Sequence, residues 1–266
     1  MENPILFIDM SYYIFYRFYA LRNWYKRSQE TELDVENVME NELFIKKYHK
    51  LFIENIKKIQ KKHNLENALI IFAKDCRRYN IWRNQYYAEY KQNRDDKNKS
   101  FNSDIFIYTY DKIVPELTEL NIKTFEVENA EGDDIIATLK KKIRQKYEEL
   151  PIYIITNDHD YLQLFDSNTY IYNLQGLNLR TKSRGEDIDL QLKILQGDIS
   201  DNISSIFGKK TSINKMLDMI NNNEKLNKFL EENEESKKLY DRNKLLIDFD
   251  MIPENIKINI NSLIEI

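Results

Sequence analysis

The sequence predicts an α/β protein whose mostly parallel central sheet is flanked by helices. Short apolar runs typical of buried strands lie at residues 5–8, 68–72, 122–127 and 152–155. Stretches with helical spacing separate them, at about 40–63, 103–120 and 131–149. Strands that alternate with helices favour a parallel, doubly wound sheet. Acidic residues follow the strands at the positions where such sheets bind ligands.

The composition bounds the class of protein. The 266 residues suffice for one large domain, or for a domain with a smaller appendage. No apolar run approaches the roughly 18 residues of a membrane span, and the start, MENPILFID, lacks the features of a signal peptide. We therefore expect an intracellular protein, in the cytoplasm, the nucleus or a viral replication site, without a membrane partner. The single cysteine, Cys76, excludes an internal disulfide and a thiolate zinc cluster.

Nine carboxylates come in short groups, most of them after a predicted strand. The first strand ends at Asp9, the second precedes Asp75, and Glu131 and Asp158 follow the next two. Helix capping explains each pair well when it is taken alone. Their joint occurrence at the carboxyl ends of strands favours one common site. The nine are Asp9, Asp75, Glu131, Asp133, Asp134, Asp158, Asp160, Asp198 and Asp201.

The chemistry of these side chains points to hard divalent cations. Carboxylates without supporting His or Cys are typical of Mg²⁺ or Mn²⁺ sites, and the three histidines form no ligand set. A pair of such ions makes phosphodiester hydrolysis the first hypothesis. The net charge is −4, but the remainder of the chain is positive once these nine acids are set aside. A basic shell around an acidic site fits a nucleic-acid substrate.

The segment 76–99 combines basic and aromatic residues. Basic side chains for phosphates and aromatic faces for unpaired bases are the ingredients of single-strand binding. An amphipathic helix with its aromatic residues in the core explains Trp82 and Tyr86 equally well. The basic residues are Arg77, Arg78, Arg83, Lys91, Arg94, Lys97 and Lys99, and the aromatic ones are Tyr79, Trp82, Tyr86, Tyr87 and Tyr90.

Six motifs in a fixed order resemble the flap endonuclease and 5′-nuclease family, which includes compact phage and viral forms and the 5′-exonuclease domain of bacterial DNA polymerase I. They are FIDMS at 7–11, Asp75, EYKQNRD at 89–95, AEGDD at 130–134, TNDHDYLQL at 156–164 and GDISDN at 197–202. The resemblance implies a PIN-like sheet, a helical arch at about 76–118 and a helix–hairpin–helix element at about 188–222. It also implies a catalytic domain over 1–180 and a helical DNA-binding region over 181–266.

The resemblance implies roles for the matched residues. Asp75, Glu131 and Asp133 would hold one Mg²⁺ or Mn²⁺ ion, and Asp158, Asp160 and Asp201 a second. Asp9, Asp134 and Asp198 would contact an ion or support a ligand. Lys91 and Arg94 would grip the scissile phosphate, while Tyr90 would stack on a base near the cut. Further DNA contacts are expected from Arg77, Arg78, Arg83, Lys97, Lys209, Lys210 and Thr211.

The hairpin departs from the family pattern. It is two residues short and carries Ser204 and Ser205 where glycine is expected, so the potassium ion common in the family is in doubt here. The segments 19–40 and 222–266 show no motif that we can match.

We expect a monomeric Mg²⁺-dependent 5′ nuclease that acts on DNA with 5′ flaps or free 5′ ends in replication or repair, with RNA primer–DNA hybrids as a further candidate substrate. Two alternatives remain. A PIN-type ribonuclease shares the sheet and the acids, but is usually about half this length and lacks the arch and GDxSDN. A catalytically silent scaffold for branched DNA has no need of mutually repulsive carboxylates.

Overall fold

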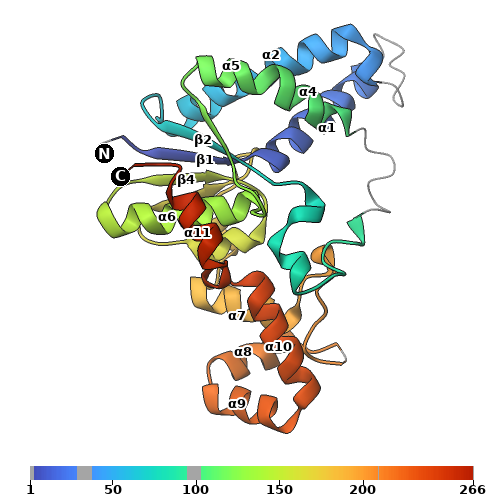
Figure 1. Ribbon diagram of the computed structural model, residues 1–266, viewed down its shortest axis with the longest axis vertical. Helices are drawn as coiled ribbons and strands as arrows, with labels where there is room; N and C mark the ends of the chain where they lie inside the picture. Colours follow the sequence, from blue (N-terminus) through green and yellow to red (C-terminus); the bar gives the residue numbers. More distant parts are fainter. Residues whose placement is uncertain (1–2, 29–37, 95–102, 209, 266) are drawn as a thin grey trace.

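A five-stranded parallel sheet forms the centre of the molecule in the computed structural model, which describes residues 3–28, 38–94, 103–208 and 210–265 (Figure 1). The strand order is β3-β2-β1-β4-β5, and all four pairings are parallel. In chain order the strands are β1 Ile5–Asp9, β2 Leu69–Lys74, β3 Lys123–Glu126, β4 Ile152–Ile155 and β5 Thr169–Tyr172. The predicted fold class is confirmed. The short edge strand β5 was not predicted.

The central strand β1 shows why these residues form a buried sheet. Ile5 and Phe7 pack into the core on one face, whereas Leu6 and Ile8 pack into the core on the other. Successive side chains of a strand point to opposite faces, so a continuous apolar run is required where helices cover both. The register places Phe7 beside Ile71 of β2 and Ile154 of β4.

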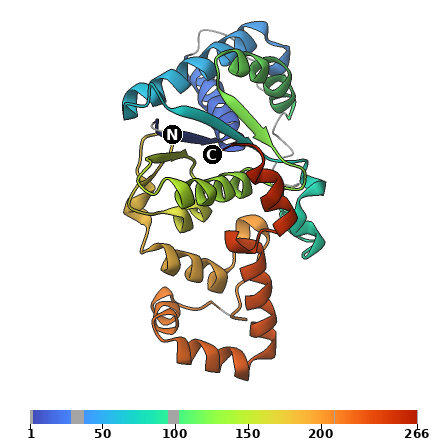
Figure 2. The same cartoon turned by 60° about the vertical axis from the view of Figure 1, so that its left-hand side comes forward.

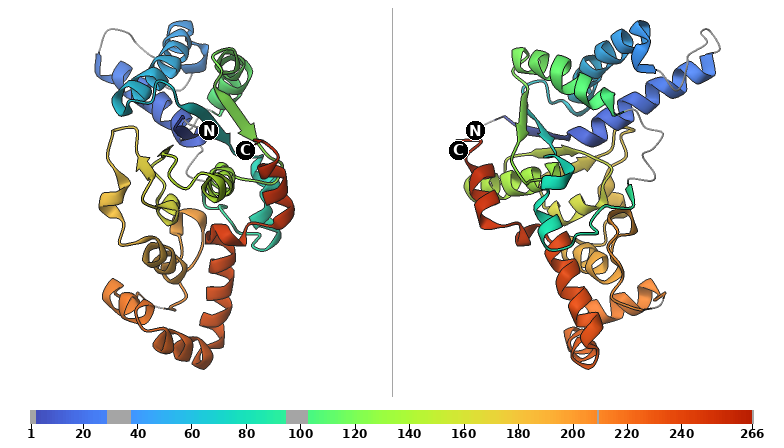
Figure 3. Two further views of the ribbon diagram at one scale, coloured as in Figure 1. Left: turned by 90° about the vertical axis from the view of Figure 1, so that its left-hand side faces the viewer. Right: turned by 45° about the vertical axis from the view of Figure 1, so that its right-hand side comes forward.

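Helices cover the two faces of the sheet (Figures 1 and 3). One face carries α1 Met10–Ser28, α2 Glu42–His63, α4 Asp104–Tyr108 and α5 Val114–Glu119, whose apolar residues share one core. The other carries α6 Gly132–Lys146 and α11 Glu254–Asn261. A π-helical turn, Thr109–Ile113, joins α4 to α5. No helix in the described ranges is long and apolar enough to cross a membrane.

Four further helices extend from the sheet as a separate helical part, which Figure 2 shows below the sheet. They are α7 Glu186–Gln196, α8 Ile213–Ile220, α9 Asn223–Glu232 and α10 Glu234–Ile247. Leu195, Met216 and Leu230 lie in a core of their own. After α10 the chain returns to the sheet, where Lys142 of α6 donates to the carbonyls of Asn261 and Ile264. The domain boundary at residue 180 remains a prediction.

The predicted arch segment begins as short turns. Two 3-10 helices, Arg78–Asn80 and Trp82–Gln85, are followed by turns up to residue 93. Trp82 is buried and Tyr86 is exposed. The core explanation therefore holds for Trp82, although it packs from a 3-10 helix.

Candidate active site

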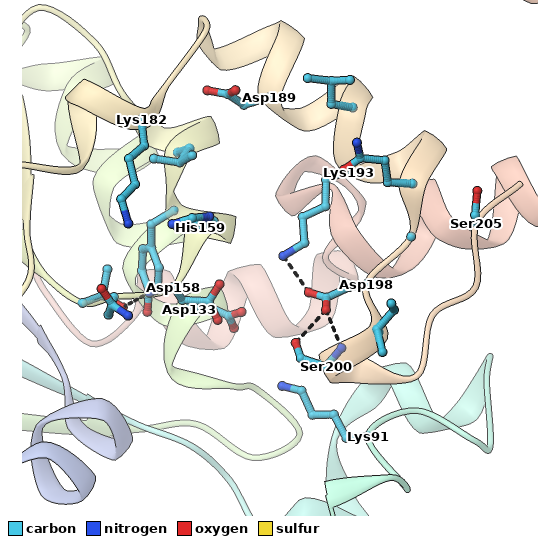
Figure 4. A pocket seen from close by; sticks show the side chains of 18 of the residues that line it. Lys91, Asp133, Asp158, His159, Lys182, Asp189, Lys193, Asp198, Ser200 and Ser205 are labelled. Carbon is cyan, nitrogen blue, oxygen red and sulfur yellow. Dashed lines mark hydrogen bonds and ion pairs between the residues drawn. The ribbon is translucent and has the colours of Figure 1, made fainter. Parts of the chain in front are cut away.

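The acidic residues gather at the carboxyl edge of the sheet, around a cavity of about 1460 Å³ between the sheet and the helical part. Asp9 ends β1 and Asp75 follows β2. The group that begins with Glu131 lies at the start of α6, and the remaining acids lie in or just before two 3-10 helices, His159–Leu164 and Ile199–Asp201. Six of the nine predicted carboxylates line this cavity: Asp9, Asp75, Glu131, Asp133, Asp158 and Asp198. Figure 4 shows part of this wall from close by.

Local packing holds Asp75 in place. Its Oδ1 accepts a hydrogen bond of 2.6 Å from the Gly132 backbone amide, and its Oδ2 accepts one of 2.6 Å from the Ser11 hydroxyl. A Cβ at Gly132 would lie 2.9 Å from the carbonyl oxygen of Ala73. Glycine at this position therefore lets α6 start directly against the end of β2, which brings Glu131 close to Asp75.

Burial and nearby negative charges raise the pKa values of three carboxylates in the cavity. Burial, followed by the charges of Asp75 and Asp158, raises the pKa of Asp9 to about 7. Burial and the charge of Glu131 raise the pKa of Asp75. Burial and the charge of Asp134 raise the pKa of Asp133. Within the described part of the chain these three acids form no ion pair, so a bound cation would supply the charge they lack.

Two further carboxylates, Glu131 and Asp201, pair with basic side chains. Lys91 forms ion pairs with Glu131 and, at 3.7 Å, with Asp201, while Arg94 pairs with Asp201. Although burial opposes it, the charge of Lys91 helps to lower the pKa of Glu131 to about 2. Lys91 has a left-handed backbone (φ 59°), and its amide donates to the Asp201 carbonyl at 3.0 Å. The YKxxR segment is therefore fastened to the GDISDN turn.

Asp134 and Arg83 pair with each other inside the protein, so Arg83 differs from its predicted contact with DNA, while the role of Asp134 at an ion remains a prediction. Both are buried, and Arg83 Nη2 donates to Asp134 Oδ1 at 2.8 Å. Trp82 Nε1 donates to Asp134 Oδ2 at 3.0 Å. Asp134 thus supports the first turn of α6 from inside the protein, and Arg83 lies below the cavity, out of reach of a DNA phosphate. Their neighbours Glu131 and Asp133 line the cavity.

The ring of Tyr90 also lies inside the protein rather than at an open stacking surface. Its side chain is buried, and its hydroxyl lies 3.0 Å from Glu131 Oε2 and 3.2 Å from Asp201 Oδ2. One hydroxyl proton can serve only one of these acceptors at a time. Tyr90 is thereby placed to orient two carboxylates, in contrast to the predicted contact with a base.

Four of the predicted DNA contacts lie at the surface or in the cavity wall. Arg77 and Arg78 are exposed beside the Arg78–Asn80 turn, and Lys210 and Thr211 line the far end of the cavity. Lys97 and Lys209 lie outside the described residues. Three cavity-lining cations were not predicted: Lys182, Arg184 and Lys193. Lys193 lies five residues before Asp198, so proximity to GDISDN was a signal that could have identified it.

The donor set fits divalent ions. Oxygens of Glu131, Asp133 and Asp134 lie within 4.8 Å of one another, as do those of Asp160, Asp198 and Asp201. Each group contains two of the three ligands predicted for one ion. Asp160 Oδ1 is buried, and the ammonium of Lys193 contacts it. An all-oxygen set of this kind suits Mg²⁺ or Mn²⁺, and the individual ligand assignments remain predictions.

Similar proteins are found both by sequence and by structure. A family model described as the 5′-3′ exonuclease N-terminal resolvase-like domain matches residues 4–191. The chain is 27% identical over 222 residues to a 5′-3′ exonuclease of Buchnera aphidicola, covering 80% of this chain and 69% of the relative. It is 28% identical over 232 residues to ribonuclease H of phage T4, covering 79% and 74%.

A solved structure of the bacteriophage T5 flap endonuclease, in a pseudo-enzyme–product complex with DNA and metal ions, has a similar fold. It superimposes with a TM-score of 0.68 at 16% identity, covering 98% of this chain and 97% of the other.

Proposed function

Because the chain belongs to the 5′-3′ exonuclease family and is a 5′ nuclease, we propose that its acidic cavity hydrolyses DNA at 5′ flaps and free 5′ ends with two Mg²⁺ or Mn²⁺ ions. The observation that carries the proposal is the convergence of carboxylates from separate strand ends on one cavity. Bound divalent ions would activate the attacking water and stabilise the departing 3′ oxygen.

The residues of this chain would hold the ions and the substrate. Asp9, Asp75 and Asp133 are the acids with the greatest need of a cation, because burial and the charges of neighbouring carboxylates raise their pKa values. Lys91 and Arg94 would release their carboxylates when ions neutralise these, and would then grip the scissile phosphate. Tyr90 would keep Glu131 and Asp201 in position through its hydroxyl.

The basic side chains that line the cavity support DNA as the substrate. Lys182, Arg184 and Lys210 also line it, where they suit a phosphate backbone. Thr211 and the start of α8, which is capped by Ser212, suit a further phosphate. The T5 flap endonuclease has been crystallised with DNA, which supports the same substrate class here. The likeness to T4 ribonuclease H keeps RNA primer–DNA hybrids as a second candidate.

A cleavage assay with matched substrates tests the proposal. A 5′-flap DNA and a single-stranded RNA of equal length are incubated with the full chain and Mg²⁺. We expect cutting of the flap DNA, and loss of cutting in Asp133→Asn, whereas Asp250→Asn on an exposed turn serves as the control. Preferential cutting of RNA would favour the PIN-type ribonuclease. Binding of flap DNA without cutting would favour the silent scaffold.

A further inference from the structure

Lys193, in the last turn of α7, occupies the middle of the second acidic group. Its ammonium contacts Asp160 Oδ1 and lies 2.8 Å from Asp198 Oδ2. The three side chains are largely shielded, with exposed fractions of 19%, 13% and 17%. Figure 4 shows Lys193 pointing from α7 at Asp198, with Lys91 on the opposite side. Lys193 thus lies where a second ion would bind.

We propose that Lys193 is a displaceable counter-cation that holds Asp160 and Asp198 together without metal and must leave when a divalent ion binds to the Asp160–Asp198–Asp201 group. This inference rests on the proposed function, because it concerns the same ion sites. It assigns Lys193 a positioning role that none of the matched motifs includes.

Electrostatics and space support the displacement. Carboxylate oxygens within 4.8 Å of one another repel strongly when all are ionised, so the group needs a positive charge. Lys91 and Arg94 pair with Asp201, and the ammonium of Lys193 supplies the charge for the other two acids. A divalent ion would use the same oxygens, so the ion and the ammonium cannot occupy this position together. Ion and ammonium therefore compete.

The competition makes the two ion positions unequal. Asp9, Asp75 and Asp133 form no ion pair within the described residues, so an ion on their side displaces a basic side chain only at Glu131, the partner of Lys91. At the Asp160–Asp198–Asp201 group an ion must first break the contacts of Lys193. We therefore infer that the first ion enters on the Asp75 side and the second beside Lys193. The displaced ammonium remains in the same cavity, on a flexible stem, and can turn to a substrate phosphate.

Divalent-ion binding to Lys193→Met tests this directly. Mn²⁺ binding to the full chain is measured without DNA, by electron paramagnetic resonance and by titration calorimetry. We expect the weaker of two sites to bind roughly tenfold more tightly in Lys193→Met, because the competing charge is gone. Lys182→Met is the matched control. Lys182 lines the same cavity but forms no ion pair within the described residues, so we expect a change of about twofold or less.

A second measurement tests how Lys193 affects the stability of the protein without metal. Without metal, Lys193→Met should melt at a lower temperature than the original chain, and Mg²⁺ should raise its melting temperature by more. Lys193→Gln, which keeps a polar side chain, should behave in the same direction if Lys193→Met does not fold. Weaker or unchanged Mn²⁺ binding in the folded variants, or a change equal to that of Lys182→Met, would overturn the proposal.

The cleavage assay separates this inference from the proposed function. If the original chain cuts flap DNA while Lys193→Met shows no gain in Mn²⁺ affinity, only the role of Lys193 fails. If the chain binds Mn²⁺ as described but cuts no nucleic acid, the nuclease function fails and the counter-cation role stands.

Discussion

Arg83 and Asp134 form a buried two-pronged ion pair beneath the acidic cavity. Arg83 Nη2 and Nη1 donate to the two carboxylate oxygens of Asp134 at 2.8 and 3.0 Å. Arg83 Nη1 also donates to Glu131 at 2.9 Å, and Arg83 Nε donates to the carbonyl of Leu246 at 2.7 Å. This pair therefore joins three parts of the chain: the segment before YKxxR, the start of α6 and the end of α10.

Asp134→Ala should destabilise the protein strongly, because it leaves the buried Arg83 without its main partner. We expect the free energy of unfolding in urea to fall by about 3 to 5 kcal/mol. The control is Lys141→Ala, which breaks an exposed ion pair with Asp250 and should cost about 1 kcal/mol or less. Equal effects of the two substitutions would show that the Arg83–Asp134 pair does not support the fold.

Stability without metal should depend on Asp9. Its pKa is about 7 in the folded protein and 3.8 when unperturbed, so the folded state binds the extra proton between these values. Stability contributed by this group is therefore present below pH 4 and lost as the pH rises to about 7. In EDTA, the free energy of unfolding of Asp9→Asn should rise relative to that of the original chain between pH 4 and about pH 7, by on the order of 2 kcal/mol.

Urea unfolding of both chains at several pH values measures that gain. Added Mg²⁺ should remove it, because the ion then compensates the charge of Asp9. A constant difference between pH 4 and pH 7 in EDTA would contradict the repulsion inferred for Asp9, Asp75 and Asp158.

Gly132→Ala should impair cleavage because the new Cβ would meet the Ala73 carbonyl at 2.9 Å and Asp75 Oδ1 at 3.2 Å. Either β2 or α6 must move, which displaces Asp75 from Glu131. We expect the turnover rate on flap DNA to fall by about 100-fold. Gly208→Ala is the control, because nothing lies within 4 Å of its added Cβ. Similar turnover in the two variants would exclude the close approach of α6 to β2 as a requirement.

Lys91→Met should slow cleavage at saturating DNA more than it weakens binding. The ammonium of Lys91 contacts Glu131 and lies near Asp201, next to the expected position of the phosphate. We expect the turnover rate to fall by on the order of 100-fold while the Kd for flap DNA rises by less than about tenfold. Single-turnover rates and DNA-binding titrations measure the two effects. An unchanged turnover rate would remove Lys91 from the chemistry.

Apolar runs and strand-end acids were enough to predict four strands and the place of the site. These features depend on local sequence, because a buried strand needs a continuous apolar run. The fifth strand, TYIY, has only four residues, and its alternation gives a weak signal. It forms because β4 offers a free edge, which only the assembled sheet provides.

The roles of individual basic and aromatic residues could not be read in the same way. Arg83, Lys91 and Arg94 look alike in the sequence, but the first is buried against Asp134 and the others face the acids of the cavity. Tyr90 likewise turns its hydroxyl inward, because the tertiary structure buries its side chain against Glu131 and Asp201. Lys193 stands alone in the apolar pattern LKILQ, so only the folding of α7 against the Asp160–Asp198–Asp201 group reveals its partners.

Whether the acidic cavity cuts DNA at 5′ flaps is tested most directly by mapping the products from a 5′-end-labelled flap substrate with Mg²⁺. The expected result is a short labelled product released at or near the flap junction by the original chain, and none in EDTA or with Asp133→Asn. Equal cutting by Asp133→Asn, cutting in EDTA, or products that shorten only from the 3′ end would contradict the proposed 5′ nuclease mechanism.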